Sequence, residues 1–284
     1  MNSAKILSPG RENGHMATPK RYAAGRARAL GLATRGTTAP NRLRRVDRWL
    51  TGVHGDLLRS AAQPPIVVDL GYGASPVTTV ELFERLRAIR PDVRVIGLEL
   101  DQDRVESAKS VEEEGLSFRR GGFELAGLRP LVVRALNVLR QYDEPAASEA
   151  WSTLLGNLVP AGLLVEGTCD EIGRRAAWVT LTPEGPQTLT LAAHLPSLVR
   201  PSELAERLPK ALIHHNVPGE PVHALLTALD EAWERSAAYA VFGPRQRWVA
   251  TCEALDWPQQ GPIRHRLGEL TVGWAGVAPS GACS

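Results

Sequence analysis

Residues 66–76 have the sequence Ile-Val-Val-Asp-Leu-Gly-Tyr-Gly-Ala-Ser-Pro, a short apolar run followed by a turn with two glycines. The β-branched residues predict a buried parallel strand, since such strands are covered on both faces. Ser75 as N-cap and Pro76 in the first turn predict a helix directly after the turn. A helix N-terminus exposes unpaired N–H groups and a partial positive charge, and glycine lets a ligand approach closely. The segment therefore predicts a strand, a turn and a helix that bind a small ligand.

Further apolar runs alternate with helical patterns on the C-terminal side of this turn. The pattern predicts a helix that begins at Pro76, a charged second helix from Gln102 to Glu114 and a third helix that carries Trp151. Strands separated by helices are typical of an α/β fold with an open, mostly parallel sheet and helices on both faces. The strands expected after the first lie at residues 93–98, 116–118, 131–137 and 163–165.

The pattern changes after Gly173. Residues 177–182 and 187–192 flank Pro183-Glu184-Gly185-Pro186 and predict a β-hairpin. A long amphipathic helix around 222–233 and a final strand at 269–274 follow, which gives the fold a C-terminal hairpin and helical extension. We therefore expect a disordered basic arm (1–36), an N-terminal helical segment (37–62), a ligand-binding core (63–173) and a C-terminal part of the same domain (174–284).

Charge is distributed unevenly along the chain. Residues 1–48 contain eleven Lys and Arg against two acidic residues, a net charge of +9, and the remainder carries −7, which together give +2. A basic arm of this kind fits nucleic acid, anionic lipid or an acidic partner, and it fits a solvated tail equally well.

Several classes of protein are disfavoured by composition. Cys169, Cys252 and Cys283 are widely spaced and form no Cys-x-x-Cys pair, which argues against a disulfide framework and a zinc site. No side chains have metal-ligand spacing, so we expect no metal. No apolar run approaches the ~20 residues of a membrane helix, and no signal-peptide pattern opens the chain. We expect a cytoplasmic protein without a membrane span.

Two acidic residues narrow the choice of ligand. A dinucleotide-binding turn has the pattern G-x-G-x-x-G, but Pro76 takes the place of its last glycine. Asp69 at the end of the first strand would repel a pyrophosphate and suits a cationic amino group. Glu99 ends the second strand, where a carboxylate accepts hydrogen bonds from both ribose hydroxyls.

With these features, residues 64–170 resemble the class I, Rossmann-like methyltransferases that use S-adenosylmethionine (SAM). Val67–Gly73 resembles the glycine-rich first motif of the family, and Val95–Glu99 resembles its second-strand acid. Three weaker matches follow in order at Gly122-Phe123-Glu124, at Ala135–Leu139 and at Val159–Val165.

The resemblance implies a Rossmann-like fold with SAM as cofactor. It implies that the two glycines shape the turn against the methionine part of SAM and that the second-strand acid holds the ribose. The sequence departs from the family pattern at Ser75, where many members have a third glycine, and at Gly122, where an acid is usual. The cofactor-binding residues implied are Asp69, Gly71, Tyr72, Gly73, Glu99, Leu100, Phe123, Glu124 and Asn137.

The methyl acceptor is expected at the carboxyl edge of the sheet, after the fourth and fifth strands. A general base is needed only if the acceptor loses a proton. Adjacent histidines in an extended segment point opposite ways, so at most one of His214 and His215 faces the cleft. The candidates for binding or deprotonating the acceptor are Arg140, Tyr142, Glu166, Asp170, His214 and His215.

Three functions remain open from the sequence, and the oligomeric state is open as well. The favoured one is methylation of a small molecule, with residues 174–284 forming the lid and acceptor pocket. The second is an RNA methyltransferase that uses residues 1–48, including Arg42-Leu43-Arg44-Arg45, to hold phosphates. Asn137-Val138-Leu139-Arg140 lacks the Asn/Asp-Pro-Pro-aromatic motif of many enzymes that methylate nucleic-acid amino groups. The third is a SAM- or nucleotide-binding interaction protein without catalysis.

Overall fold

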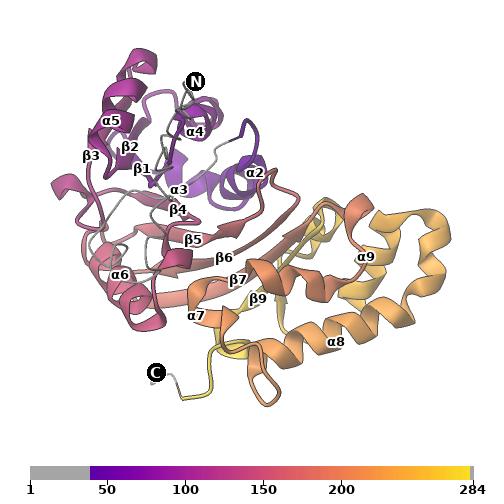
Figure 1. Ribbon diagram of the computed structural model, residues 1–284. Helices are drawn as coiled ribbons and strands as arrows, with labels where there is room; N and C mark the ends of the chain where they lie inside the picture. The colour runs from indigo at the N-terminus through magenta and orange to yellow at the C-terminus, as the bar shows by residue number, and fades with distance from the viewer. Residues whose placement is uncertain (1–38, 282–284) are drawn as a thin grey trace, which may run out of the picture.

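The computed structural model describes residues 39–281, and its strands form one nine-stranded sheet (Figure 1). The expected arm, residues 1–36, lies outside the described residues. Parallel pairing joins β3 (Leu116–Arg120), β2 (Arg94–Glu99), β1 (Ile66–Leu70), β4 (Val132–Leu136) and β5 (Leu163–Cys169), in that spatial order. Because β2 follows β1 on one side and β4 lies on the other, the chain reverses direction across the sheet between β1 and β4. Such a switch point is where open α/β sheets bind ligands, at the carboxyl ends of the strands.

The remaining strands extend the sheet with antiparallel pairing. β6 (Arg175–Thr182) pairs with β5, β7 (Gly185–Ala193) pairs with β6, and β9 (Glu269–Gly273) lies between β7 and β8 (Gln259–Gln260). The predicted hairpin and final strand are confirmed, and the fold is α/β with a mixed sheet whose central strands are parallel. No helix separates β5 from β6.

Helices cover both faces of the sheet, as expected. One face is covered by α2 (Arg44–Val53), α3 (Gly55–Arg59) and α4 (Val77–Arg87). Its largest buried contact is edge-to-face between Trp49 of α2 and Trp178 of β6, with ring centroids 5.3 Å apart.

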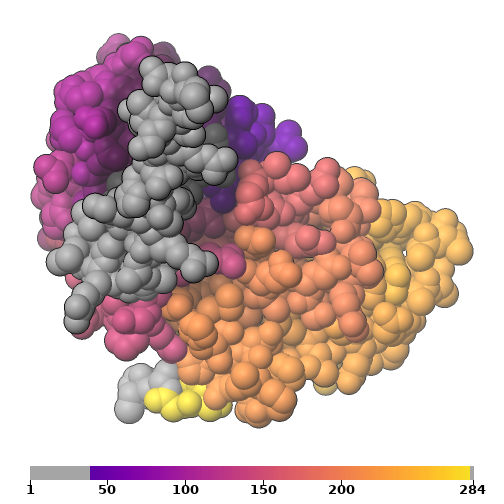
Figure 2. Space-filling model, viewed as in Figure 1, coloured from indigo at the N-terminus to yellow at the C-terminus, as the bar shows by residue number. Residues whose placement is uncertain are grey.

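The opposite face packs against α6 (Glu144–Gly156) and the C-terminal helices α7 (Lys210–Ile213), α8 (Pro221–Arg235) and α9 (Pro244–Glu253). Burial of Leu225, Leu226, Leu229 and Trp233 confirms the predicted amphipathic helix. In the space-filling view, residues of the C-terminal half, drawn in orange shades, lie together on one side of the molecule (Figure 2).

Two helix boundaries differ from the sequence prediction. Pro76 is the N-cap of α4, and the Ser75 hydroxyl only accepts a 3.4 Å hydrogen bond from the Val77 N–H, so the helix starts one residue later than predicted. The charged second helix, α5 (Gln102–Ala108), ends in a 3-10 turn at Lys109–Val111 and does not continue to Glu114.

Candidate functional site

The turn between β1 and α4 holds its two glycines in left-handed backbone conformations. Gly71 has φ +67° and Gly73 has φ +83°, values that other L-residues adopt only with strain. A Cβ on Gly71 would lie 2.8 Å from a methyl group of Val138, in the loop after β4. The turn is therefore packed against the loop after β4, across the switch point. A larger residue at position 71 would clash with Val138, so glycine is required there.

Glu99 brings a buried carboxylate from β2 to this turn. Its side chain is 4% exposed, and one oxygen accepts a 3.0 Å hydrogen bond from the Gly73 N–H. The other oxygen accepts bonds of 2.9 and 3.4 Å from the N–H groups of Leu100 and Asp101. Each carboxylate oxygen has two acceptor sites, so the oxygen bonded to Gly73 retains one, with Arg104 3.6 Å away, while the group stays fixed beside the glycines.

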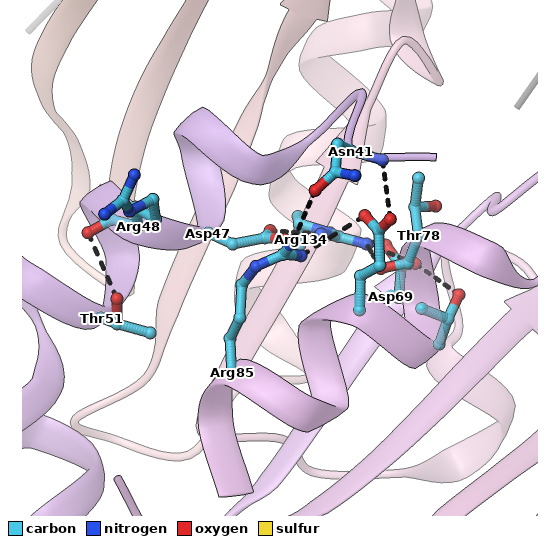
Figure 3. Close-up of polar contacts among 10 residues, drawn as sticks. Asn41, Asp47, Arg48, Thr51, Asp69, Thr78, Arg85 and Arg134 are labelled. Atoms are coloured by element: carbon cyan, nitrogen blue, oxygen red, sulfur yellow. Dashed lines mark hydrogen bonds and ion pairs between the residues drawn. The ribbon is translucent and has the colours of Figure 1, made fainter. Parts of the chain in front are cut away.

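Asp69, in contrast, does not face the carboxyl edge. Its carboxylate is buried and receives a bidentate ion pair from Arg134 of β4, at 2.9 and 2.7 Å (Figure 3). The Thr79 hydroxyl donates a further 2.6 Å bond to it. The expectation that Asp69 receives a cationic amino group of the ligand is therefore wrong, because Arg134 already compensates its charge.

Arg134 is the centre of a buried charge network that joins the sheet to two helices. Besides Asp69, it pairs with Asp47 of α2 and donates to the Thr78 carbonyl of α4 (Figure 3). Burial by itself lowers the pKa of Arg134, but the charges of Asp47 and Asp69 outweigh burial and raise it above its usual value. Arg85 of α4 pairs with the second Asp47 oxygen at 2.7 Å. Two arginines and two aspartates thus neutralise one another inside the protein.

The aromatic residues predicted for the cofactor have different environments. Tyr72 is buried and packs edge-to-face on Phe118, so its ring belongs to the core, and the charges of Glu99 and Asp69 act on its hydroxyl. Phe123 is half-buried after β3, with its ring 5.4 Å from that of Tyr142. Glu124 is exposed and accepts a 2.8 Å bond from the Gly122 N–H, so its carboxylate supports the local turn. Leu100, half-buried, follows Glu99 at the carboxyl edge.

Asn137 ends β4 with a left-handed backbone, φ +64°. Its N–H donates to the Gly167 carbonyl, and its side-chain oxygen accepts a 3.0 Å bond from the Cys169 N–H. Its amide nitrogen lies 3.3 Å from the Cys169 sulfur. The side chain therefore joins the ends of β4 and β5 and shapes the edge at which it lies.

The structure separates the predicted acceptor residues. Arg140 is exposed and Tyr142 half-buried, both in the loop between β4 and α6. Burial raises the pKa of the Tyr142 hydroxyl, which disfavours it as a base. Asp170 accepts bonds from the N–H groups of Ile172, Arg174 and Arg175, so it organises the β5–β6 turn and is not free to act as a base.

The prediction that Glu166 binds or deprotonates the acceptor is also wrong, because its side chain lies in the interior. Its side chain is 0% exposed on β5, on the face covered by α6. The Trp151 indole of α6 faces it, but neither side chain completes a hydrogen bond within residues 39–281. Burial raises the pKa of Glu166 to about 8. It is a neutral buried acid at pH 7, away from the accessible edge.

The adjacent histidines lie in the turn after α7 and have different partners. His214 is exposed, with Nε2 2.9 Å from the Lys210 Nζ. His215 Nε2 lies 2.7 Å from Glu144, at the start of α6, and its Nδ1 lies 3.6 Å from Glu220. Since both ring nitrogens of His215 face carboxylates, the ring connects α6 to the loop before α8 and is poorly placed to take a proton from an acceptor.

Part of the basic cluster at residues 42–45 is hydrogen-bonded within the folded protein. Arg42 donates to the carbonyls of Cys169 and Asp170, and Arg45 donates to that of Leu267. Arg44 remains exposed. Two of the three arginines in this cluster therefore bond to backbone carbonyls of the fold.

No group of three or more His, Cys, Asp or Glu side chains among residues 39–281 is arranged to hold a metal ion. None of the helices in the same part of the chain is long and apolar enough to cross a membrane.

The sequence analysis did not identify Arg134 or Arg207. Arg134 could have been identified, because it is a single charge within the apolar run Leu131-Val132-Val133-Arg134-Ala135. Arg207 gave no signal, because it reaches the carboxyl edge only through the fold: its carbonyl accepts a hydrogen bond from the Thr168 hydroxyl of β5.

Comparisons with known proteins give matches of fold only. No protein-family model matches the chain, and no curated protein sequence does. Among solved structures, it is similar to magnesium protoporphyrin IX methyltransferase from Synechocystis PCC 6803 with bound SAH, at 21% identity and a TM-score of 0.34 over 44% of this chain and 53% of that one. The plantazolicin methyltransferase BamL is 16% identical, with a TM-score of 0.34 over 44% of this chain and 46% of that one. Human N-acetylserotonin methyltransferase with SAM is 19% identical, with a TM-score of 0.31 over 44% of this chain and 36% of that one. The chain thus spans 53% or less of the length of these three proteins.

Proposed function

We propose that this protein is a SAM-dependent methyltransferase that acts on a small-molecule acceptor. One observation carries the proposal: the buried carboxylate of Glu99 is fixed beside the Gly71–Gly73 turn, at the carboxyl ends of β1 and β2. A ligand at this place meets a helix N-terminus, a backbone without Cβ atoms and a carboxylate acceptor within one turn. SAM carries a ribose with two hydroxyl donors, one of which suits the acceptor site that Glu99 retains.

The residues at this site fit such a cofactor, but fewer of them are assigned to it than the sequence suggested. The proposal assigns the ribose to Glu99 and the methionine part to the backbone of the glycine turn, and it leaves Asp69 out. Leu100 and Phe123, both half-buried at the carboxyl edge, supply apolar surface on the β2–β3 side. SAM would supply an electrophilic methyl group, while the protein aligns the acceptor and excludes water.

Calorimetry on the purified protein tests the cofactor assignment. We expect micromolar binding of SAM and S-adenosylhomocysteine and no comparable binding of NAD. Glu99→Gln should weaken SAM binding at least tenfold, since hydrogen bonds to a charged group contribute about 1.5–3 kcal/mol each. Glu84→Gln is the matched control, because Glu84 is exposed on α4 and should leave binding within about twofold of wild type. Micromolar NAD binding, or SAM binding unaffected by Glu99→Gln, would contradict the proposal.

Transfer of a labelled methyl group into fractionated cell extract tests catalysis. Label in a small-molecule fraction supports the proposal. Retention of SAM without turnover on any fraction would indicate a binding protein, and label in RNA would identify a nucleic-acid methyltransferase.

A further inference from the structure

Two arginines meet at the ends of β4 and β5. Arg140 lies three residues after Asn137, whose side chain bonds to the last residue of β5. Arg207 is placed at the same edge by the bond from the Thr168 hydroxyl to its carbonyl. The 3-10 turns that carry them, at residues 139–141 and 201–207, both contact β5. The pKa of Arg140 is lowered first by burial and then by the positive charge of Arg207.

Most of the donors of these two guanidinium groups have no acceptor in the described part of the chain. Arg140 makes no hydrogen bond or ion pair with any residue from 39 to 281. The Nε of Arg207 is buried without a hydrogen-bond partner among the same residues, and its ion pair with Glu206 is long, at 3.8 Å. A buried donor without an acceptor costs about 1–3 kcal/mol, so this arrangement favours an acceptor supplied from outside the chain.

The position of the pair relative to the switch point suggests what it binds. The glycine turn and Glu99 occupy the β1–β2 side, so a second ligand at the same edge must lie on the β4–β5 side. Val138, two residues before Arg140, is the residue against which Gly71 packs, so the two halves of the edge adjoin. Resting on the proposed methyltransferase function, we propose that Arg140 and Arg207 bind an anionic group, a carboxylate or a phosphate, of the small-molecule acceptor. Paired guanidinium groups bind both anions through parallel hydrogen bonds.

Two carboxylates oppose this site. Glu171 and Glu206 both act electrostatically on Arg140, and both are exposed. Glu206 has a side chain that is 71% exposed, so it can turn into solvent when an anion binds. Removing its charge should therefore strengthen anion binding.

Titrations followed by arginine Nε–H signals in two-dimensional NMR test the site. Inorganic phosphate and succinate are the probes, with glycerol as the uncharged control, in the presence and absence of S-adenosylhomocysteine. We expect millimolar binding of at least one anion, with a shift of the Arg207 Nε–H signal; the stronger probe identifies the anionic group. Arg140→Gln and Arg207→Gln should each weaken binding at least tenfold, and Glu206→Gln should strengthen it severalfold. Arg94→Gln is the matched control, because Arg94 is exposed at the amino end of β2, on the opposite edge.

Absence of a shift with both anions would overturn the site, as would equal losses in Arg140→Gln and Arg94→Gln. If Arg207→Gln fails to fold, Arg140→Gln still decides, because Arg140 forms no bond within residues 39–281 that folding could lose. Binding of S-adenosylhomocysteine without anion binding overturns this site alone. Phosphate or succinate binding without S-adenosylhomocysteine binding supports the anion site and overturns the methyltransferase proposal. A loss of S-adenosylhomocysteine affinity in Arg140→Gln, with no anion binding, would place the arginine on the cofactor and overturn the acceptor site.

Discussion

Glu166 provides a direct test of the buried arrangement between β5 and α6. The flanking residues on the neighbouring strands are Ala135 and Val179, so no charge from the sheet compensates its carboxylate. Burial raises its pKa from 4.5 to about 8, and the Trp151 indole offsets this only in part. Between these two pH values the unfolded chain releases the proton while the folded protein retains it.

Because the folded protein retains this proton, its free energy of unfolding falls as the pH rises. One retained proton changes the free energy of unfolding by about 1.4 kcal/mol per pH unit. Over the interval from 4.5 to about 8, the loss reaches on the order of 5 kcal/mol, of which roughly 3 kcal/mol is present at pH 7. Above the folded-state pKa, both states are ionised and the loss stops growing.

Urea unfolding followed by circular dichroism at pH 5, 6, 7 and 8 measures this contribution. Other titrating groups cancel in the difference between wild type and Glu166→Gln, so that difference should grow in favour of the variant by about 1.4 kcal/mol per unit between pH 5 and 7. Glu166→Leu should show the same slope, with a different constant offset from packing. Glu84→Gln, the same change at an exposed site, should show no slope. A difference between wild type and Glu166→Gln that is constant with pH would refute the buried, uncompensated carboxyl.

Three further predictions concern the residues that hold the site together. Arg134→Leu leaves buried Asp69 without its charge partner and leaves Asp47 with Arg85 alone, and it should lower the free energy of unfolding by about 3–5 kcal/mol in urea. Gly71→Ala should lose about 1–3 kcal/mol more than Gly127→Ala in the same assay, since both glycines have similar positive φ but only Gly71 faces a methyl group at 2.8 Å. Equal losses would show that conformation alone requires glycine there. His215→Gln should cost about 1 kcal/mol through its two carboxylate partners, whereas exposed His214→Gln should be neutral in thermal unfolding.

Local pattern accounts for the parts of the fold that the sequence predicted. The β-branched run at 66–68, the turn glycines and Pro76 together predict β1, the turn and α4 because each acts through the backbone of its own neighbourhood. The hairpin around Pro183–Pro186 is predictable for the same reason. The insertion of β9 between β7 and β8 depends on pairing between β7 and β9, whose partner residues lie 77 to 85 positions apart, and no local pattern encodes this.

The candidate site shows the same limit more clearly. Asp69 has the position of a ligand-binding acid, and its actual partner, Arg134, lies 65 residues further along the chain. Alternation along β5 places Glu166 on the same face as Leu164, but only the three-dimensional position of α6 closes that face. A polar residue near the end of a strand is thus predictable from sequence, whereas its charge partner is not.

The charged residues near the carboxyl edge form two groups: those that pair with one another, and those that keep a free acceptor or donor site. Asp47, Asp69, Arg85 and Arg134 neutralise one another, so they stabilise the contact between sheet and helices and have no charge left for a ligand. Glu99 retains an acceptor site on one side of the switch point, and Arg140 and Arg207 retain donors on the other. An acceptor faces a ligand hydroxyl and donors face an anion, so the two sides of one edge bind chemically different groups.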